Sequence, residues 1–255
     1  MNVTLTDPVT YGLRLGDSDI ALNDFLGKPV QFTFKGEIYC VQCGRKTTKS
    51  FQQGHCFPCM KRINECNNCM IHPERCLVEA GNCPEDDWAH RQCHAPQYIY
   101  LANSSGLKVG VTRDTNIPSR WIDQGAITAL AIMKAPNRRQ AGLVEVAFKK
   151  YVNDKTNWRA MLKNEITEID LLAEKARLMS LMTDYGSSVS EMLDHEKVVT
   201  IHYPVLSYPT VIKSLSFDET PVISGVLQGI KGQYVLLDTG VLNIRKFSGY
   251  NVVFS

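Results

Sequence analysis

Cysteines are the residues of this chain whose type and spacing most clearly point to chemistry. All nine lie between positions 40 and 93, and six of them form three pairs with two residues between the thiols. That spacing lets both sulfurs of a tight turn face one point, as a tetrahedral zinc ion requires. The pairs are Cys40 and Cys43, Cys56 and Cys59, and Cys66 and Cys69. The first two pairs, twelve residues apart, predict a structural zinc ribbon.

The remaining cysteines predict a second zinc ion, because the segment that carries them has little apolar surface to hold it in order. Four thiolates would complete the coordination shell of this second ion and leave one cysteine over. We expect its ligands to be Cys66, Cys69, Cys83 and Cys93. Cys76 is the main alternative, and the nearby histidines are His72, His90 and His94. A single zinc ribbon followed by buried, reduced cysteines is the competing interpretation.

The remaining sequence favours a reducing compartment. No apolar run approaches the ~20 residues that span a bilayer. The first 19 residues carry three aspartates and lack a basic stretch followed by an apolar one. We therefore expect no signal peptide, no membrane partner and a cytoplasmic location. Thiols stay reduced in the cytoplasm, so paired cysteines there indicate metal binding rather than disulfides.

Positive charge is concentrated just after the cysteines, although the whole chain is close to neutral. Residues 96–160 contain ten Lys and Arg against four Asp and Glu, whereas residues 161–255 contain eight against eleven. An excess of this kind favours an anionic partner, and nucleic acid, either DNA or RNA, is the first to expect. A solvated basic face without a ligand is the simpler alternative.

Two strands and two helices are predicted to position the polar residues of this basic stretch. The runs 98–102 and 107–112 are joined by a four-residue turn and predict a β-hairpin. Gly110, inside the second run, suggests that another group approaches the backbone closely. Arg120 follows the start of a helix, and Glu145 lies on a second helix at about 138–152, whose apolar residues recur at helical spacing.

Over residues 97–160 this arrangement resembles the GIY-YIG nuclease fold. In that family a hairpin carries two short triplets, one helix supplies an arginine, a later helix supplies a metal-binding glutamate, and an asparagine follows. Tyr98-Ile99-Tyr100 stands at the first triplet and Lys108-Val109-Gly110 at the second. The later positions are matched by Arg120, Glu145 and Asn157.

The resemblance implies cleavage of a phosphodiester with Mg²⁺ or Mn²⁺ held at Glu145. Lys108 stands where the family has a tyrosine, and a lysine acts as a base only when its pKa is lowered. The implied catalytic residues are Tyr100, Lys108, Arg120, Glu145 and Asn157. The implied nucleic-acid contacts are Lys108, Arg113, Arg120, Arg138 and Arg139. The structural alternatives are Tyr100 in the core, Glu145 paired with Lys149, and Asn157 in a turn.

Nearly the whole chain is also similar to an uncharacterised bacterial family whose domain has no assigned function. The stretches that carry this similarity are 108–113, 120–126 and 154–158. Membership of that family implies the cysteine clusters but no particular activity.

Both ends of the chain are predicted to be rich in β-structure. Residues 30–34 alternate apolar and polar side chains, and residues 198–255 contain short strands separated by glycine turns. We expect the two ends to pair as one small barrel-like module. Residues on that module that could contact nucleic acid are Tyr234, Arg245, Lys246, Phe247 and Tyr250. Residues 159–182 are predicted as one amphipathic helix.

The sequence therefore predicts an α+β protein of five segments. These are a β segment at 1–39, a zinc module at 40–96, a GIY-YIG-like domain at 97–160, a helical connector at 161–197 and a β module at 198–255. The predicted function is that of a zinc-containing nucleic-acid-binding protein with GIY-YIG-type endonuclease activity. The alternative is a non-catalytic adaptor that binds nucleic acid or another protein.

Overall fold

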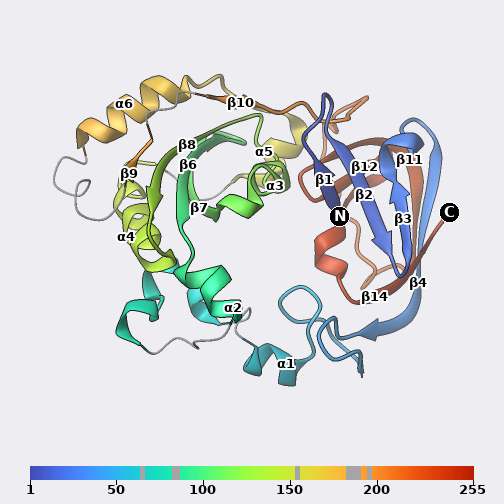
Figure 1. Ribbon diagram of the computed structural model, residues 1–255. Helices are drawn as coiled ribbons and strands as arrows, with labels where there is room; N and C mark the ends of the chain where they lie inside the picture. Colours follow the sequence, from blue (N-terminus) through green and yellow to red (C-terminus); the bar gives the residue numbers. More distant parts are fainter. Residues whose placement is uncertain (64–66, 82–86, 153–155, 182–190, 194–196) are drawn as a thin grey trace. The chain divides into compact units, whose positions relative to one another are not determined.

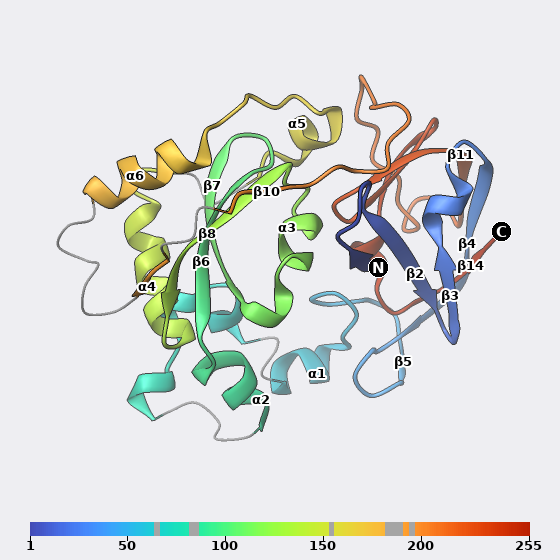
Figure 2. The same cartoon turned by 45° about the horizontal axis from the view of Figure 1, so that its top comes forward.

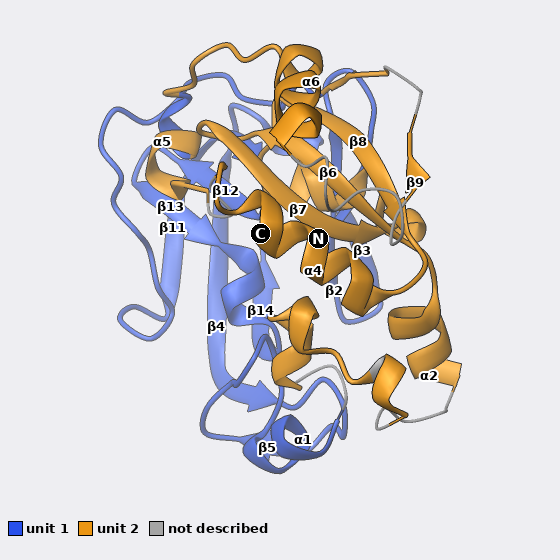
Figure 3. Cartoon of the chain, turned by 90° about the vertical axis from the view of Figure 1, so that its left-hand side faces the viewer, with its two compact units in different colours: residues 1–66, 162–164, 201–255 blue, residues 67–161, 165–200 orange. Residues whose placement is uncertain are grey.

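The computed structural model describes the chain except for residues 64–66, 82–86, 153–155, 182–190 and 194–196. The fold is mixed α+β and divides into two compact units, shown in different colours in Figure 3. Unit 1 comprises residues 1–66, 162–164 and 201–255, and unit 2 comprises residues 67–161 and 165–200. Among the described residues, every helix is too short or too polar to cross a bilayer.

Unit 1 contains a six-stranded sheet that curves into a half-barrel and a separate three-stranded sheet (Figure 1). The larger sheet has the order β13-β12-β11-β4-β14, with β5 beside β4. Its strands are β4 (Pro29–Tyr39), β5 (Lys46–Thr47), β11 (Val222–Lys231), β12 (Tyr234–Leu237), β13 (Gly240–Asn243) and β14 (Tyr250–Phe254). The smaller sheet consists of β1 (Asn2–Thr4), β2 (Thr10–Leu15) and β3 (Ser18–Ala21).

Strand β4 joins the two ends of the chain within unit 1. It pairs antiparallel with β11 along one edge and with β14 along the other, so that Phe32 lies opposite both Ile223 and Phe254. Val30 and Phe32 are buried while Gln31 is exposed, which is the alternation that predicts a half-buried strand. The strand predicted at residues 30–34 is therefore confirmed, and it extends to Tyr39.

Unit 2 is built on a five-stranded sheet with the order β10-β8-β6-β7 and with β9 beside β8. Its strands are β6 (Gln97–Asn103), β7 (Leu107–Arg113), β8 (Thr128–Ala135), β9 (Glu191–Met192) and β10 (Val199–Thr200). The predicted hairpin is confirmed by the pairing of β6 with β7, in which Tyr100 lies opposite Gly110. Strand β6 also pairs with β8, so the first hairpin strand lies inside the sheet.

Helices cover both faces of this sheet (Figure 2). Two of them, α4 (Arg138–Phe148) and α6 (Leu171–Leu181), pack on one face through apolar side chains such as Val144, Phe148 and Leu178. The short helix α3 (Ser119–Asp123) lies on the other face, where the ring of Trp121 meets that of Tyr100. The cysteine-rich part of the chain carries two further short helices, α1 (Phe57–Arg62) and α2 (Asp87–Ala89).

The prediction of a single helix over 159–182 is wrong. Helix α5 (Trp158–Lys163) ends where Asn164 takes a left-handed conformation with φ of 59°, and α6 begins at Leu171. Asp170 caps the second helix, because its Oδ1 accepts hydrogen bonds from the backbone N–H groups of Leu172 and Ala173 at 2.9 and 3.1 Å. The amphipathic pattern over 159–182 is thus divided into two helices, because Asp170 caps the second one within it.

A lysine lies in the core of unit 1. Lys231, at the end of β11, is fully buried, and its Nζ donates a hydrogen bond to Oδ1 of Asn164 at 2.8 Å. The ammonium lies 5.4 Å from the ring centroid of Tyr203 and 5.1 Å from that of Tyr208. Burial lowers the pKa of Lys231 to about 8. The fold therefore contains a cation whose charge is stabilised by rings and one amide rather than by a carboxylate.

This burial predicts that the protein becomes more stable between pH 8 and 9.5. In that window Lys231 keeps its proton in the unfolded chain but loses it in the fold, so raising the pH favours the folded state. Denaturant unfolding should show a rise of about 1–2 kcal/mol in the free energy of unfolding. Lys231→Met should remove this rise, while Lys213→Met, at an exposed lysine of the same unit, should retain it. A flat wild-type profile would contradict the prediction.

Candidate functional site

The first two cysteine pairs meet in unit 1 beyond the end of β4. The four sulfurs of Cys40, Cys43, Cys56 and Cys59 all lie within 4.8 Å of one another, and the Sγ atoms of Cys43 and Cys56 are 3.9 Å apart. Zn–S bonds of ~2.3 Å in a tetrahedron place sulfurs ~3.8 Å apart, so the geometry fits a structural metal ion such as zinc. Four sulfur ligands leave no open position for water or substrate.

Tight turns position these sulfurs. Gly44 adopts a left-handed φ of 69° directly after the first pair, and its N–H donates to the carbonyl of Cys40 at 2.9 Å. Cys56 stands at the N-terminal cap of α1, so Cys59 lies on the first turn of that helix. The spacing seen in the sequence is thus converted into one cluster by a glycine turn and a helix start.

The charge state of the cluster favours a cation. Burial opposes ionisation of Cys40, but hydrogen bonds from the backbone N–H groups of Cys56, Cys43 and Gln42 outweigh it and lower the pKa to about 6. Burial raises the pKa of Cys59 to about 12, together with hydrogen bonding to the other three thiols. Once one thiolate has formed, a second negative sulfur at this distance is stable only with a positive ion between them.

Three of the later cysteines, Cys69, Cys76 and Cys93, meet in unit 2. Cys66 and Cys83, two of the four ligands predicted for a second zinc ion, lie outside the described residues. Cys76 and Cys93 are each 1% exposed and pack together with Cys69 and Trp88. Cys76, the alternative ligand, therefore lies in the same cluster as two of the preferred ones.

Helix α4 holds in place the segment of residues 69–79, which carries Cys69 and Cys76 and is called the cysteine segment. The guanidinium of Arg138 donates to the backbone carbonyls of Cys69 and Met70, the latter at 2.7 Å. Gly142 faces the backbone at Pro73 and Glu74, where a Cβ atom would come within 2.3 Å of the Glu74 nitrogen. This contact requires glycine, so α4 is a docking surface for the segment as well as a core helix.

The start of α4 is also tied to this segment, through Glu79. Its carboxylate accepts hydrogen bonds from Asn137, Arg139 and Gln140, and the Arg139 contact is 2.5 Å. Arg138 and Arg139, which the sequence suggests as nucleic-acid contacts, both bind the cysteine segment. Arg113 is another residue that the sequence suggests as a nucleic-acid contact. Burial lowers the pKa of Arg113, and the nearby charge of Arg138 lowers it further.

Tyr100 belongs to the set of residues in unit 2 that the GIY-YIG resemblance suggests as a site; this set, Tyr100, Lys108, Arg120, Glu145 and Asn157, is called the Tyr100 group. The ring is fully buried against Gly110, where a Cβ atom would lie 2.5 Å from the tyrosine oxygen. The hydroxyl donates to Oε1 of Gln124 at 3.0 Å. Burial raises the pKa of Tyr100, the charge of Arg120 opposes that rise, and the charge of Glu145 adds to it. The tertiary structure thus brings Arg120 and Glu145 within electrostatic range of one hydroxyl.

The other members of the group also have defined contacts. Glu145 is 8% exposed, and its Oε2 pairs with Nζ of Lys149 at 3.3 Å, the i, i+4 contact foreseen as the structural alternative. Nζ of Lys108, also buried, donates to Oγ1 of Thr156 at 3.4 Å. Asn157 caps α5 by accepting a hydrogen bond from the N–H of Ala160. Arg120 is exposed.

Gln124 is a member of the site that the sequence analysis missed. It accepts the hydrogen bond of Tyr100 and, with Trp121, surrounds the ring. Its position four residues after Arg120 places both on one side of a helical turn, which is the signal that could have identified it.

The contact between Tyr100 and Gly110 generates a stability prediction. Gly110→Ala should lower the free energy of unfolding by about 2 kcal/mol, because the new methyl group collides with a buried ring. Gly12→Ala is a matched control, since Gly12 also lies inside a strand but its Cβ would meet its neighbours at an ordinary 3.7 Å. Equal effects in denaturant unfolding would show that the predicted collision is relieved at little cost.

The comparisons with known proteins place the chain in a family. No curated protein and no solved structure matches it. The model of one family, described as a protein of unknown function (DUF2797), matches residues 27–252, which include both cysteine clusters and the Tyr100 group. Because this match covers most of the sequence, the chain belongs to the DUF2797 family.

Proposed function

We propose that this protein binds nucleic acid through unit 2, and that structural zinc ions brace the cysteine-bearing parts of the chain. The observation that carries this proposal is the exposed guanidinium of Arg120, in unit 2, which lies within electrostatic range of the buried Tyr100 hydroxyl, as does Glu145. An exposed guanidinium suits a phosphate oxygen, because it donates several hydrogen bonds and is positively charged. The excess of basic residues over 96–160 supports the same partner.

A GIY-YIG-like fold of unit 2 is part of the proposal. The hairpin β6–β7, the helix with Arg120 and the later helix with Glu145 occur in the order that the resemblance implies. The close packing of Tyr100 on Gly110 across the hairpin adds support, since these residues belong to the two triplets.

Binding is better supported than cleavage. A divalent ion at Glu145 would have to compete with the Lys149 ammonium, which already pairs with that carboxylate. Asn157 uses its side chain to cap a helix, and Lys108 stands in place of the family's tyrosine. Endonuclease activity is the second candidate function, favoured by the shared influence of Arg120 and Glu145 on Tyr100.

Salt-dependent binding tests the proposal. The full chain should bind fluorescein-labelled DNA or RNA, and its affinity should fall on the order of tenfold or more when salt rises from ~50 to ~200 mM. Arg120→Ala should weaken binding and reduce the slope of log affinity against log salt by about 1. Arg177→Ala, which removes an exposed arginine from α6 on the opposite face of the sheet, is the matched control. Absence of binding to single strands, hairpins and duplexes would overturn the proposal.

The same reactions with Mg²⁺ or Mn²⁺ address the second candidate. Binding without product supports the non-catalytic reading. Cleavage that Glu145→Gln abolishes would establish the endonuclease instead, and cleavage that survives this substitution would indicate a contaminating enzyme.

Two zinc ions per chain are part of the proposal, because Cys69, Cys76 and Cys93 pack together in a segment of short turns. Elemental analysis of the purified protein should give about two equivalents. Cys43→Ser should remove the ion of the first cluster, and Cys93→Ser should remove the other. One equivalent that Cys93→Ser leaves unchanged would eliminate the second ion.

A further inference from the structure

A cleft of about 990 Å³ lies on unit 1, and its lining includes no residue of the Tyr100 group. It is bordered by part of strand β4, the loop between the first two cysteine pairs, residues 217–218, and Lys246 and Tyr250. This volume is at the upper end of the range of ~300–1,000 Å³ that small-molecule sites occupy. The cleft therefore has room for one or two aromatic bases with their phosphates.

Aromatic rings form one wall of the cleft. Phe34 of β4 and Tyr250 of β14 are half-buried, and their ring centroids are 4.9 Å apart. Phe217 lies behind them, with its centroid 6.1 Å from that of Phe34 and 6.4 Å from that of Tyr250. Partly exposed rings that neighbouring rings hold in place are the surfaces on which nucleobases stack.

Positive charge lines the rim. Three of the residues around the cleft are lysines, namely Lys46, Lys49 and Lys246. Lys46 pairs with Glu37 at 2.8 Å and Lys246 with Asp218 at 3.5 Å, but both pairs are at least one-third exposed. Exposed ion pairs of this kind are weak, so a phosphate group can replace the carboxylates as a partner.

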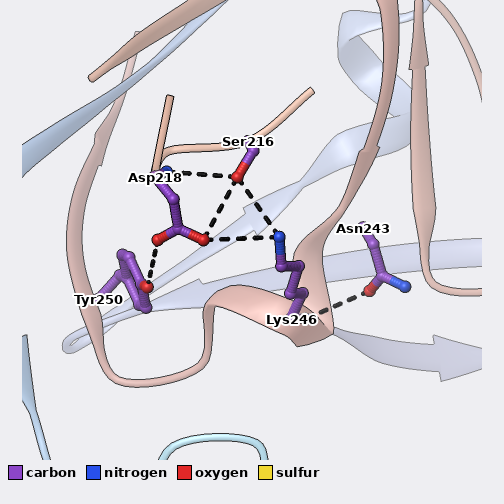
Figure 4. Close-up of polar contacts among 5 residues, drawn as sticks. All are labelled: Ser216, Asp218, Asn243, Lys246 and Tyr250. Carbon is purple, nitrogen blue, oxygen red and sulfur yellow. Dashed lines mark hydrogen bonds and ion pairs between the residues drawn. The ribbon is translucent and has the colours of Figure 1, made fainter. Parts of the chain in front are cut away.

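Asp218 is a fixed hydrogen-bond acceptor in the cleft (Figure 4). Its Oδ1 accepts from the hydroxyl of Tyr250 at 2.8 Å, and its Oδ2 lies 3.4 Å from Oγ of Ser216. The hydrogen bond from Tyr250 lowers the pKa of Asp218, and burial raises the pKa of Tyr250 to about 12. Asp218 is thus ionised while Tyr250 keeps its proton, and a carboxylate accepts hydrogen bonds from base amino groups.

We propose that this cleft binds single-stranded nucleic acid, with one or two bases stacked on Phe34 and Tyr250 and the flanking phosphates held by Lys49 and its neighbours. The proposal extends the proposed function, since it assumes the same class of partner but a separate site. Ring faces can receive a base only when that base is unstacked, so the cleft favours single strands over duplexes.

The first cysteine cluster supports this site. Lys46 and Lys49 lie between Cys43 and Cys56, and Lys46 is held next to β4 by the pairing of β5. A metal ion that joins both cysteine pairs would fix the two ends of this loop and so keep its lysines at the rim of the cleft.

Fluorescence anisotropy with short labelled oligonucleotides tests the proposal on the full chain. Phe34→Leu should weaken binding of a single strand about tenfold, because one stacking surface is lost while apolar volume is largely retained. Lys49→Gln should reduce the salt slope by about 1. Phe25→Leu is the matched aromatic control, since Phe25 is half-buried with a ring neighbour at 4.9 Å but does not border the cleft. Lys28→Gln is the matched lysine control, since the ammonium groups of Lys28 and Lys49 each lie over a phenylalanine ring.

An abasic oligonucleotide of the same length separates base recognition from attraction to the backbone. It should bind at least tenfold more weakly than the normal strand and should be insensitive to Phe34→Leu. Equal affinity for both strands, or an equal loss in Phe34→Leu and Phe25→Leu, would overturn the base-binding cleft. A mononucleotide that binds as tightly as the oligonucleotide would also overturn it, in favour of a free nucleotide. Thermal unfolding of each variant verifies that it is folded.

Arg120→Ala in the same assay keeps the two sites distinguishable. Single-strand binding that falls in Phe34→Leu but not in Arg120→Ala supports the cleft and contradicts the proposed role of unit 2. The reverse pattern supports unit 2 and contradicts the cleft.

Discussion

The pairing of strand β4 with both β11 and β14 is the interaction on which unit 1 depends. It joins residues near the beginning of the chain to residues near its end, and the shared burial of Phe32, Ile223 and their neighbours holds the three strands together. The same strand runs directly into Cys40, so it positions the first metal knuckle. It also contributes Phe34 to the aromatic wall of the cleft. The same sheet therefore supports both the first cysteine of the cluster and the aromatic wall of the cleft, which keeps these side chains in a defined geometry.

Helix α4 has the corresponding role in unit 2. One face packs against the sheet through Val144 and Phe148, while Gly142 allows the backbone near Pro73 to approach closely. Its first turn binds the cysteine segment through Arg138 and Arg139. These arginines account for part of the positive charge that the sequence shows after the cysteines. A charge count does not reveal that carbonyls and a carboxylate of the same unit already engage them.

Most members of the Tyr100 group have a structural role in unit 2. Glu145 pairs with Lys149, Asn157 caps a helix and Lys108 is buried beside Thr156, so each residue stabilises the fold. Arg120 is the exposed cation of the group, and its charge acts on a hydroxyl that is itself buried. One exposed cation and an already paired carboxylate are the reasons for which we propose phosphate binding ahead of a metal-dependent reaction.

The sequence by itself determined the features that depend on neighbouring residues. The two-residue spacing of the first four cysteines, the hairpin around residues 103–106 and the apolar repeat of α4 all arise from local backbone geometry, which short patterns encode. The sequence did not reveal the helix break at Asn164, because an amphipathic repeat can continue across one left-handed residue and an internal cap. Tertiary structure alone decided which distant residues meet: Cys76 with Cys93, Gln124 with Tyr100, and Phe34 with Phe217 and Tyr250. Those contacts depend on how strands and helices pack after they form, and hydrophobic burial, which drives that packing, is not specific to any one pair of residues.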